Sequence, residues 1–474
     1  MKKIDINESK IIDEDILSSE NLESSNKVYI DEGMGEVNGD KVKKVAFFTL
    51  GCKVNQYETE AMLELFKKDG YIGVDSESYA DVYVINTCTV THMSDRKSRQ
   101  YIRRMKKVNP NSIIAVVGCY SQVSPEEILD IEDVNLVMGT NDRLQIVEKI
   151  RELNSKSKLS TVDDIMKVKE FEEIEISQTN GKTRAFIKIQ DGCDRYCTYC
   201  IIPYARGRVR SRQLEDITRE IEKLAYKGYK EVVLTGIHVA SYGKDLKDGS
   251  SLLTVIKAIN EIDGIERIRL SSVEPVLFTD EFVDEICKIK KLAPHYHLSL
   301  QSGCDTVLER MNRRYSAEEY KHIVDVLRDR IEDVSITTDV IVGFPGESDE
   351  EFDQTLNFLK DIKLMHTHVF KYSPRKGTKA AEMKNQVDPK IKTDRSNILL
   401  DLCSENFREN CSKYIGKKMR VLFEEKDSNG YYDGLTDNYI RVKVKSDEEI
   451  SDRFLDVIIE KIEKDYCIGS LADI

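Results

Sequence analysis

The 474-residue sequence lacks any long hydrophobic run. No apolar stretch approaches the roughly 18–20 residues that a membrane-spanning helix requires, which argues against an integral membrane protein. The first forty residues also lack the apolar stretch of a secretory signal peptide, and they are acidic rather than basic. We therefore expect a cytoplasmic protein without a membrane partner.

An excess of positive charge is also missing. The chain has 72 Lys and Arg against 85 Asp and Glu, a net charge of −13, which argues against a surface that binds nucleic acid everywhere. Residues 1–42 alone hold eleven acidic and five basic side chains and show no sustained apolar period, so we expect a disordered acidic extension there. A polyanionic partner would have to meet a local basic patch.

The chain after residue 42 begins with a region of short β-branched runs that alternate with helical stretches. This pattern over residues 43–150 predicts a doubly wound parallel sheet. Residues 151–183 are polar and are expected to be a connecting segment. The five predicted strands lie at residues 45–48, 71–72, 82–85, 113–117 and 135–137.

Two further regions complete an α/β architecture. Over residues 184–412, six predicted strands alternate with helices, which indicates a partial (βα)6 barrel, short of the eight units of the full form. Residues 413–474 contain short strand-like runs separated by turns such as Asn429-Gly430, and they predict a small all-β barrel. The six strands are Ala185–Gln190, Glu231–Gly236, Arg267–Ser272, Tyr296–Leu300, Ser335–Val342 and Thr367–Tyr372, and the final runs are Met419–Glu424, Tyr439–Val444 and Phe454–Ile459.

The most specific signal is a C-x3-C-x2-C run directly after the first barrel strand. The eleven cysteines of this chain favour metal or redox chemistry over disulfides. Three thiolates on one loop can hold three irons of a four-iron cluster and leave the fourth iron open for a substrate-like cofactor. The alternatives are a zinc site or plain core cysteines, but a zinc site usually closes with four ligands, and no fourth Cys or His lies nearby in the sequence. We call Cys193, Cys197 and Cys200 the loop trio.

Three other cysteines share one context although they are far apart in the sequence. Cys52, Cys88 and Cys119, which we call the strand-end trio, each follow a predicted strand directly. In the strand order 2-1-3-4-5 the three strands are neighbours, about 4.8 Å apart, so the thiols would meet within roughly 10 Å. This predicts a second open three-cysteine cluster site. The alternative is three unrelated buried cysteines.

The loop trio and its position resemble the radical S-adenosylmethionine (SAM) enzymes. That resemblance implies reductive cleavage of SAM at the open iron, which yields methionine and a 5′-deoxyadenosyl radical. It also implies cofactor contacts at the carboxyl ends of the barrel strands. The candidates there are Thr235, Gly236, Ser271, Ser272, Gln301, Gly343 and Gly346, and for the glycines a plain turn is the alternative.

Both trios together resemble the methylthiotransferase family, from about residue 43 to a final β domain of the TRAM type. The first motif, Leu50–Glu58, is similar to the MtaB branch, which adds a methylthio group to carbon 2 of N6-threonylcarbamoyladenosine beside the tRNA anticodon. Sister branches, which act on isopentenyladenosine or a ribosomal protein, would favour Gln-Met or Pro-Lys after Cys52. Segments 197–207, 298–303 and 342–347 are also family-like. A non-catalytic iron–sulfur electron carrier or RNA-binding protein is the alternative from another class.

The resemblance implies a division of labour between two [4Fe-4S] clusters. One SAM would methylate a sulfur attached to an auxiliary cluster on the strand-end trio, and a second SAM would be cleaved at the loop trio. Carbon 2 of a purine is unactivated, so replacing its hydrogen requires radical chemistry from a cofactor. The implied partners are tRNA and a low-potential electron donor such as flavodoxin or ferredoxin.

Two groups of basic residues are candidates for RNA contact. The first, Arg96, Arg99, Arg103 and Lys107, follows the spacing of one helical face, and the second, Arg206, Arg208, Arg210 and Arg212, lies after the loop trio. A solvated helix face and structural salt bridges are the alternatives. Residues 414–474 hold ten basic and fourteen acidic side chains, so an RNA role for the final domain rests on resemblance alone.

The remaining cysteines and four strand-flanking histidines are expected to be structural. We interpret Cys287, Cys403, Cys411 and Cys467 as packing thiols and leave Cys304 unassigned. We interpret His295, His297, His366 and His368 as core or rim histidines rather than ligands.

Overall fold

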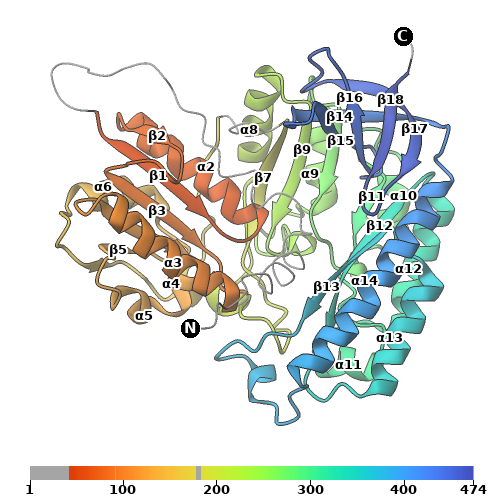
Figure 1. Cartoon of the computed structure of the whole chain (residues 1–474), viewed down its shortest axis with the longest axis horizontal. Coiled ribbons are helices and arrows are strands. Elements are labelled where there is room, and N and C mark those ends of the chain that lie inside the picture. The colour runs from red at the N-terminus through yellow and green to blue at the C-terminus, as the bar shows by residue number, and fades with distance from the viewer. Residues whose placement is uncertain (1–41, 91, 178–182, 473–474) are drawn as a thin grey trace, which may run out of the picture.

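The computed structural model describes residues 42–90, 92–177 and 183–472 (Figure 1). The predicted acidic extension therefore lies, except for residue 42, outside the described residues. Every helix within these ranges is too short or too polar to span a bilayer. Figure 1 shows a parallel sheet flanked by helices, a larger open barrel beside it, and a small β-barrel near the end of the chain.

The amino-terminal sheet has the predicted order, with one strand more than expected. All its strands are parallel, in the order β2-β1-β3-β4-β5-β6. The sixth strand comes from the expected connecting segment, where Leu159 pairs with Leu136; two residues carry no periodic signal, so the sequence gives no sign of it. The strands are β1 (Lys44–Thr49), β2 (Ile72–Val74), β3 (Val82–Thr87), β4 (Ile113–Gly118), β5 (Leu136–Val137) and β6 (Leu159–Ser160).

Helices cover both faces of this sheet because its strands are apolar on both sides. Val45 and Phe47 pack against Phe66 on one face, whereas Ala46 and Ile85 belong to a separate core on the other. The helices are α2 (Lys53–Lys68), α3 (His92–Val108), α4 (Cys119–Val123), α5 (Pro125–Leu129) and α6 (Ile146–Arg151), with short 3-10 turns at Arg143–Gln145 and Ile165–Lys167.

All six predicted barrel strands are present and parallel to their neighbours. The chain forms β10-β9-β7 and β11-β12-β13, and isolated bridges such as Val273 to Leu298 join the two halves. The strands are β7 (Arg184–Asp191), β9 (Glu231–Gly236), β10 (Arg267–Leu270), β11 (His295–His297), β12 (Ser335–Val342) and β13 (His366–Lys371), and β8 (Arg210–Ser211) pairs antiparallel with β7. The helices are α7 (Ile202–Arg206), α8 (Leu214–Tyr226), α9 (Leu252–Asn260), α10 (Asp280–Ile286), α11 (Asp305–Arg310), α12 (Ala317–Arg330), α13 (Asp349–Ile362) and α14 (Pro389–Ser412), with 3-10 turns at Val239–Ser241, Pro275–Leu277 and Lys379–Glu382.

The carboxyl-terminal region is a closed five-stranded barrel, as the strand-like runs predict, although two of its strands had not been recognised. Its strands are β14 (Lys418–Lys426), β15 (Tyr431–Thr436), β16 (Arg441–Lys445), β17 (Phe454–Ile462) and β18 (Cys467–Leu471). The end of β15 and the loop after it dock at the amino end of the large barrel, where Arg269 donates to the carbonyl oxygens of Thr436 and Asp437. The carboxyl ends of the barrel strands are therefore at the opposite end from this contact.

Helix α2 joins the amino-terminal domain to the large barrel. Tyr57 and Ala61 of this helix belong to the hydrophobic core of the barrel. The Tyr57 hydroxyl donates to the carbonyl oxygen of Ile174 at 2.5 Å and to buried Glu220 at 3.1 Å. Because Cys52 immediately precedes α2, this packing sets the strand-end trio against the barrel.

Candidate active site

The loop trio lies at the carboxyl end of β7, on a loop that only glycine can start. Gly192 has a φ of +72°, and a Cβ there would lie 1.8 Å from the carbonyl oxygen of Arg208. The Cys193 amide donates to the carbonyl of Gly207 at 3.0 Å, and the Cys200 amide donates to that of Cys197 at 2.9 Å. The loop is thus folded back against the segment that follows α7.

The sulfurs of the loop trio are close enough to influence one another. Burial raises the pKa of Cys200 to about 12, and the neighbouring Cys197 and Cys193 thiols contribute to the rise. Burial likewise raises the pKa of Cys193 to about 11. Arg313 donates a hydrogen bond to Cys197 Sγ at 3.4 Å. Thiols crowded in this way need a bound cation to ionise at neutral pH, as a metal cluster provides.

A charged network beside the loop trio was not predicted from the sequence. Glu274, between β10 and α10, pairs with Arg195, which lies inside the cysteine loop. His238 Nε2 lies 3.1 Å from Glu274, and Arg313 lies 4.0 Å from it. Burial alone would raise the pKa of Glu274, but the hydrogen bond and charge of His238, with the two arginines, lower it to about 2. The position of Arg195 in the C-x3-C-x2-C run was the one signal available.

The three strand ends that carry the strand-end trio lie side by side, as the strand order predicts. Cys52 caps α2, Cys88 follows β3, and Cys119 opens α4 directly after β4. A Cβ on Gly51 would lie 2.8 Å from the Cβ and 3.1 Å from the Sγ of Cys88, so the loop before Cys52 touches Cys88. The pKa of Cys88 is raised to about 12, mainly by burial and then by the neighbouring Cys119 and Cys52 thiols.

Arg206 links the strand-end trio to the loop trio. It is fully buried, and its Nε donates to Cys119 Sγ at 3.2 Å. Its other nitrogens bind Glu58 and the side chain of Asn55, at 2.6 Å, and reach Asp191 at 3.4 Å. Asp191 comes two residues before Cys193, so one guanidinium contacts residues of both cysteine sites.

In neither trio are the three sulfurs as close together as the ligands of a single small ion. Four ligands of one zinc lie about 2.3 Å from the metal, which brings their sulfurs close together. Among the residues that the structure describes, the group with ligand atoms all within 4.8 Å of one another is His297, Asp339 and His368, and neither cysteine trio qualifies. Sulfurs set farther apart are what the corners of an iron–sulfur cube require. Each trio therefore supplies the three thiols that a [4Fe-4S] site would need, and the cluster itself stays a prediction.

The predicted SAM-contact residues lie at the carboxyl ends of the barrel strands, on the same rim as the loop trio. Thr235 and Gly236 end β9, and Gln301, with a φ of +73°, follows β11 and is bonded to β12. Gly343 has a structural reason to be glycine, since a Cβ there would lie 2.3 Å from Lys392. Ser271, Ser272 and Gly346 complete this rim. Their contact with SAM stays a prediction.

One of the two predicted RNA-binding groups is wrong in most of its members. Arg206, Arg210 and Arg212 are buried, because each forms ion pairs with carboxylates inside the molecule. Their alternate spacing reflects an ion-paired interior rather than a surface, and within that group only Arg208 is exposed. On α3, Arg96, Arg103 and Lys107 are exposed, whereas Arg99 pairs with Glu127 at 2.8 Å.

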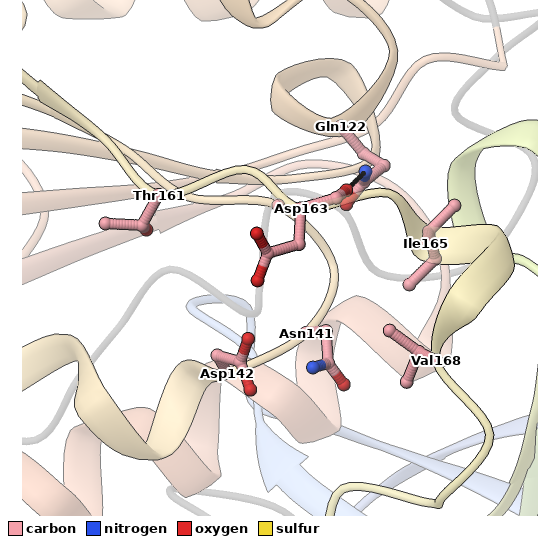
Figure 2. A pocket seen from close by; sticks show the side chains of 8 residues that line it. Gln122, Asn141, Asp142, Thr161, Asp163, Ile165 and Val168 are labelled. Carbon is pink, nitrogen blue, oxygen red and sulfur yellow. Dashed lines mark hydrogen bonds between the residues drawn. The ribbon is translucent and has the colours of Figure 1, made fainter.

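The remaining five cysteines differ in their burial. Cys403, Cys411 and Cys467 are buried, as expected of packing thiols, but Cys287 is exposed at the end of α10. Cys304 is buried against Gln354. Figure 2 shows a separate small hollow beside α4 that includes neither trio, lined by Gln122, Gly139, Asn141, Asp142, Thr161, Asp163, Ile165 and Val168.

Comparison with known proteins identifies all three parts of the chain. Residues 187–359 match the model of the radical SAM superfamily, residues 412–472 match the TRAM domain, and residues 44–139 match a family described as uncharacterized protein family UPF0004. The chain is 43% identical over 435 residues to the threonylcarbamoyladenosine tRNA methylthiotransferase MtaB of Bacillus subtilis, covering 90% of this chain and 96% of that protein. This chain belongs to the MtaB branch of the radical SAM methylthiotransferases. It is therefore an enzyme.

Other relatives fall in the same branch or in a sister branch of the family. The MtaB of Aquifex aeolicus is 42% identical over 86% of this chain and 98% of its own. A tRNA-2-methylthio-N(6)-dimethylallyladenosine synthase of Clostridium tetani is 35% identical over 90% of this chain and 96% of its own. Among solved structures, the radical SAM methyltransferase TsrM of Kitasatospora setae matches with a TM-score of 0.51 and 15% identity, covering 69% of this chain and 73% of that one. That last likeness concerns the fold alone.

Proposed function

We propose that this enzyme replaces the carbon-2 hydrogen of N6-threonylcarbamoyladenosine in tRNA with a methylthio group, using two SAM molecules and two [4Fe-4S] clusters. The identity with relatives of that printed activity over nine-tenths of the chain carries the proposal. The strand-end trio supports it, since it adds a second cysteine site beside the radical SAM loop. The substrate is the finer part of this proposal, because the wider family also includes relatives named for dimethylallyladenosine.

The residues of this chain would divide the work between the two trios. The loop trio would hold the cluster that, once bound with SAM, supplies a radical able to act on an unactivated aromatic carbon. The strand-end trio would hold the auxiliary cluster. Arg313 and Arg206 donate hydrogen bonds to one thiol of each trio and hold it in place. A low-potential donor such as flavodoxin or ferredoxin would supply electrons, in the cytoplasm.

Nucleoside analysis tests the substrate directly. A strain that lacks this gene should lose the 2-methylthio derivative of N6-threonylcarbamoyladenosine from its tRNA and accumulate the unmethylthiolated form. Reintroducing the gene should restore the product, measured by mass spectrometry of digested tRNA. Loss of the dimethylallyl derivative instead would move the enzyme to the sister branch, and an unchanged nucleoside profile would refute a tRNA methylthiotransferase.

Two cysteine variants separate the proposed roles. Cys197→Ala should abolish formation of 5′-deoxyadenosine, since the loop trio would lose one of its three ligands. Cys88→Ala should retain 5′-deoxyadenosine formation but yield no methylthiolated RNA. Cys403→Ala, a buried thiol that belongs to neither trio, is the matched control and should behave as wild type. Methylthiolated product from Cys88→Ala would refute this division of labour.

A further inference from the structure

The inner face of the large barrel is unusually polar on one side. Along β11, β12 and β13, alternate residues such as Tyr296, Ile336 and Val340 pack outward into the hydrophobic core. The intervening residues therefore face inward. We call the inward group His295, His297, Thr337, Asp339, His366 and His368 the histidine wall.

The histidine wall is internally hydrogen bonded and reachable by solvent. His297 Nε2 lies 3.1 Å from an Asp339 oxygen, and His297 Nδ1 lies 3.0 Å from the Thr337 hydroxyl. His368 sits opposite Asp339 in the β12–β13 register, with its ring 5.6 Å from that of His297. The side chains of His297 and Asp339 remain 13% and 26% exposed, so the group is not sealed inside the fold.

Lys53 reaches the same interior from the amino-terminal domain. It directly follows Cys52, and its ammonium lies over the ring of Phe186 at 5.6 Å. Phe186 is an inward residue of β7, because its neighbours Ala185 and Ile187 pack into the outer core. Lys53 is also close enough to His295 for its charge to contribute to the lowered pKa of that imidazole, after burial, Arg269 and His297. A cation next to the strand-end trio thus points toward the histidine wall.

We propose that Lys53 and the histidine wall bind the polar substituent on N6 of the substrate adenosine, with Lys53 as the counter-ion of its carboxylate. This inference rests on the proposed function and gives it a structural basis. Threonine attached through its amino group keeps a free carboxylate and a hydroxyl, which match an ammonium and a row of imidazole, hydroxyl and carboxylate groups. The position N6 flanks the same ring edge as carbon 2, so the substituent can extend into the barrel while carbon 2 faces the trios.

An apolar substituent would fit this interior poorly. A dimethylallyl group offers no hydrogen bonds, and the polar groups of the histidine wall would lose water without gaining a partner. Sites built to hydrogen-bond a substrate reject analogues that lack the partner much more strongly than apolar pockets reject small changes in size. The wall therefore selects against the substrate of the sister branch.

A comparison of charged and neutral substrates tests the role of Lys53. Anticodon stem-loops carry either N6-threonylcarbamoyladenosine or its methyl ester, and both binding and methylthiolation are measured. Wild type should prefer the acid by roughly thirtyfold or more in kcat/KM, because the ester removes the charge that the Lys53 ammonium would pair with. Lys53→Met should lose that preference, and Lys53→Arg should keep most of it. Lys67→Met, an exposed lysine in the last turn of the same helix, is the matched control.

The outcomes separate this inference from the proposed function. If wild type forms product and Lys53→Met still prefers the acid, the inference is wrong and the proposed function stands. If wild type methylthiolates only dimethylallyl stem-loops, both are wrong.

A second variant tests the wall itself. His368→Leu should weaken binding of acid and ester alike, because it removes a hydrogen-bonding group rather than the counter-ion. Elemental analysis is done in parallel, since two imidazoles and a carboxylate are also a common metal site. One zinc or manganese ion per wild-type chain that His368→Leu lacks would overturn the assignment of this wall to the substrate.

Discussion

At the scale of single residues, the site depends on buried arginines that the sequence presented as surface residues. Arg206 was expected to contact RNA, but its side chain is fully buried against Cys119, Glu58 and Asn55. A row of alternating arginines looks the same in sequence whether it faces phosphate or carboxylates of another domain. The cysteines could be predicted because their chemistry and their strand-end positions are local, whereas the partners of Arg206 come from distant segments.

Arg206→Lys should lower the reduction potential of the auxiliary cluster. Lysine keeps the positive charge but cannot reproduce the planar guanidinium that reaches Cys119 Sγ and Glu58 together. Hydrogen bonds to cluster sulfurs stabilise the reduced, more negative state, so losing one should lower the potential by on the order of 50 mV. Redox titration followed by electron paramagnetic resonance measures it. Arg208→Lys, an exposed neighbour, should leave the potential unchanged.

At the scale of elements, helix α3 carries the one predicted basic group whose residues are mostly exposed. Helical spacing placed Arg96, Arg103 and Lys107 together, and the structure leaves all three exposed. Long elements with clear periodicity, such as this helix and the six barrel strands, could be predicted. The two-residue strands β6 and β8 could not, because so few residues carry no period.

Replacing Arg96, Arg103 and Lys107 with alanine should lower the affinity for tRNA. It should also make that affinity less dependent on salt. Each lost phosphate contact should reduce the slope of log affinity against log salt by about one. Binding is measured by fluorescence anisotropy across a salt series. Arg104→Ala is the control, because Arg104 lies on the same helix but pairs with Glu77. Equal slopes for the triple variant and wild type would remove α3 from the RNA interface.

At the scale of the whole molecule, a buried group of ion-paired residues connects the carboxyl-terminal β-barrel to the large barrel. Glu231 is fully buried and pairs with Arg267 and Arg269, which also donate to the backbone at the end of β15. Burial alone would raise the pKa of Glu231, but the two arginines lower it to about 2. A lowered carboxyl pKa means stability that is present at neutral pH and is lost as acid protonates the group.

Glu231→Gln should remove part of the acid sensitivity of folding. At pH 7 the free energy of unfolding of the apoprotein should be lower than that of wild type by about 3 kcal/mol. This difference should shrink as pH falls from about 4.5 toward 2, because wild-type Glu231 then becomes protonated. Urea unfolding at several pH values measures it, and a difference that is constant with pH would contradict the role given to Glu231.

The two-site architecture is tested most directly by counting iron and sulfide in anaerobically reconstituted protein, with Mössbauer spectra to identify the clusters. Wild type should hold about eight irons per chain as two [4Fe-4S] clusters. Alanine at all three loop-trio positions, or at all three strand-end positions, should each leave about four. About four irons in wild type, unchanged when Cys52, Cys88 and Cys119 are replaced together, would contradict the second site.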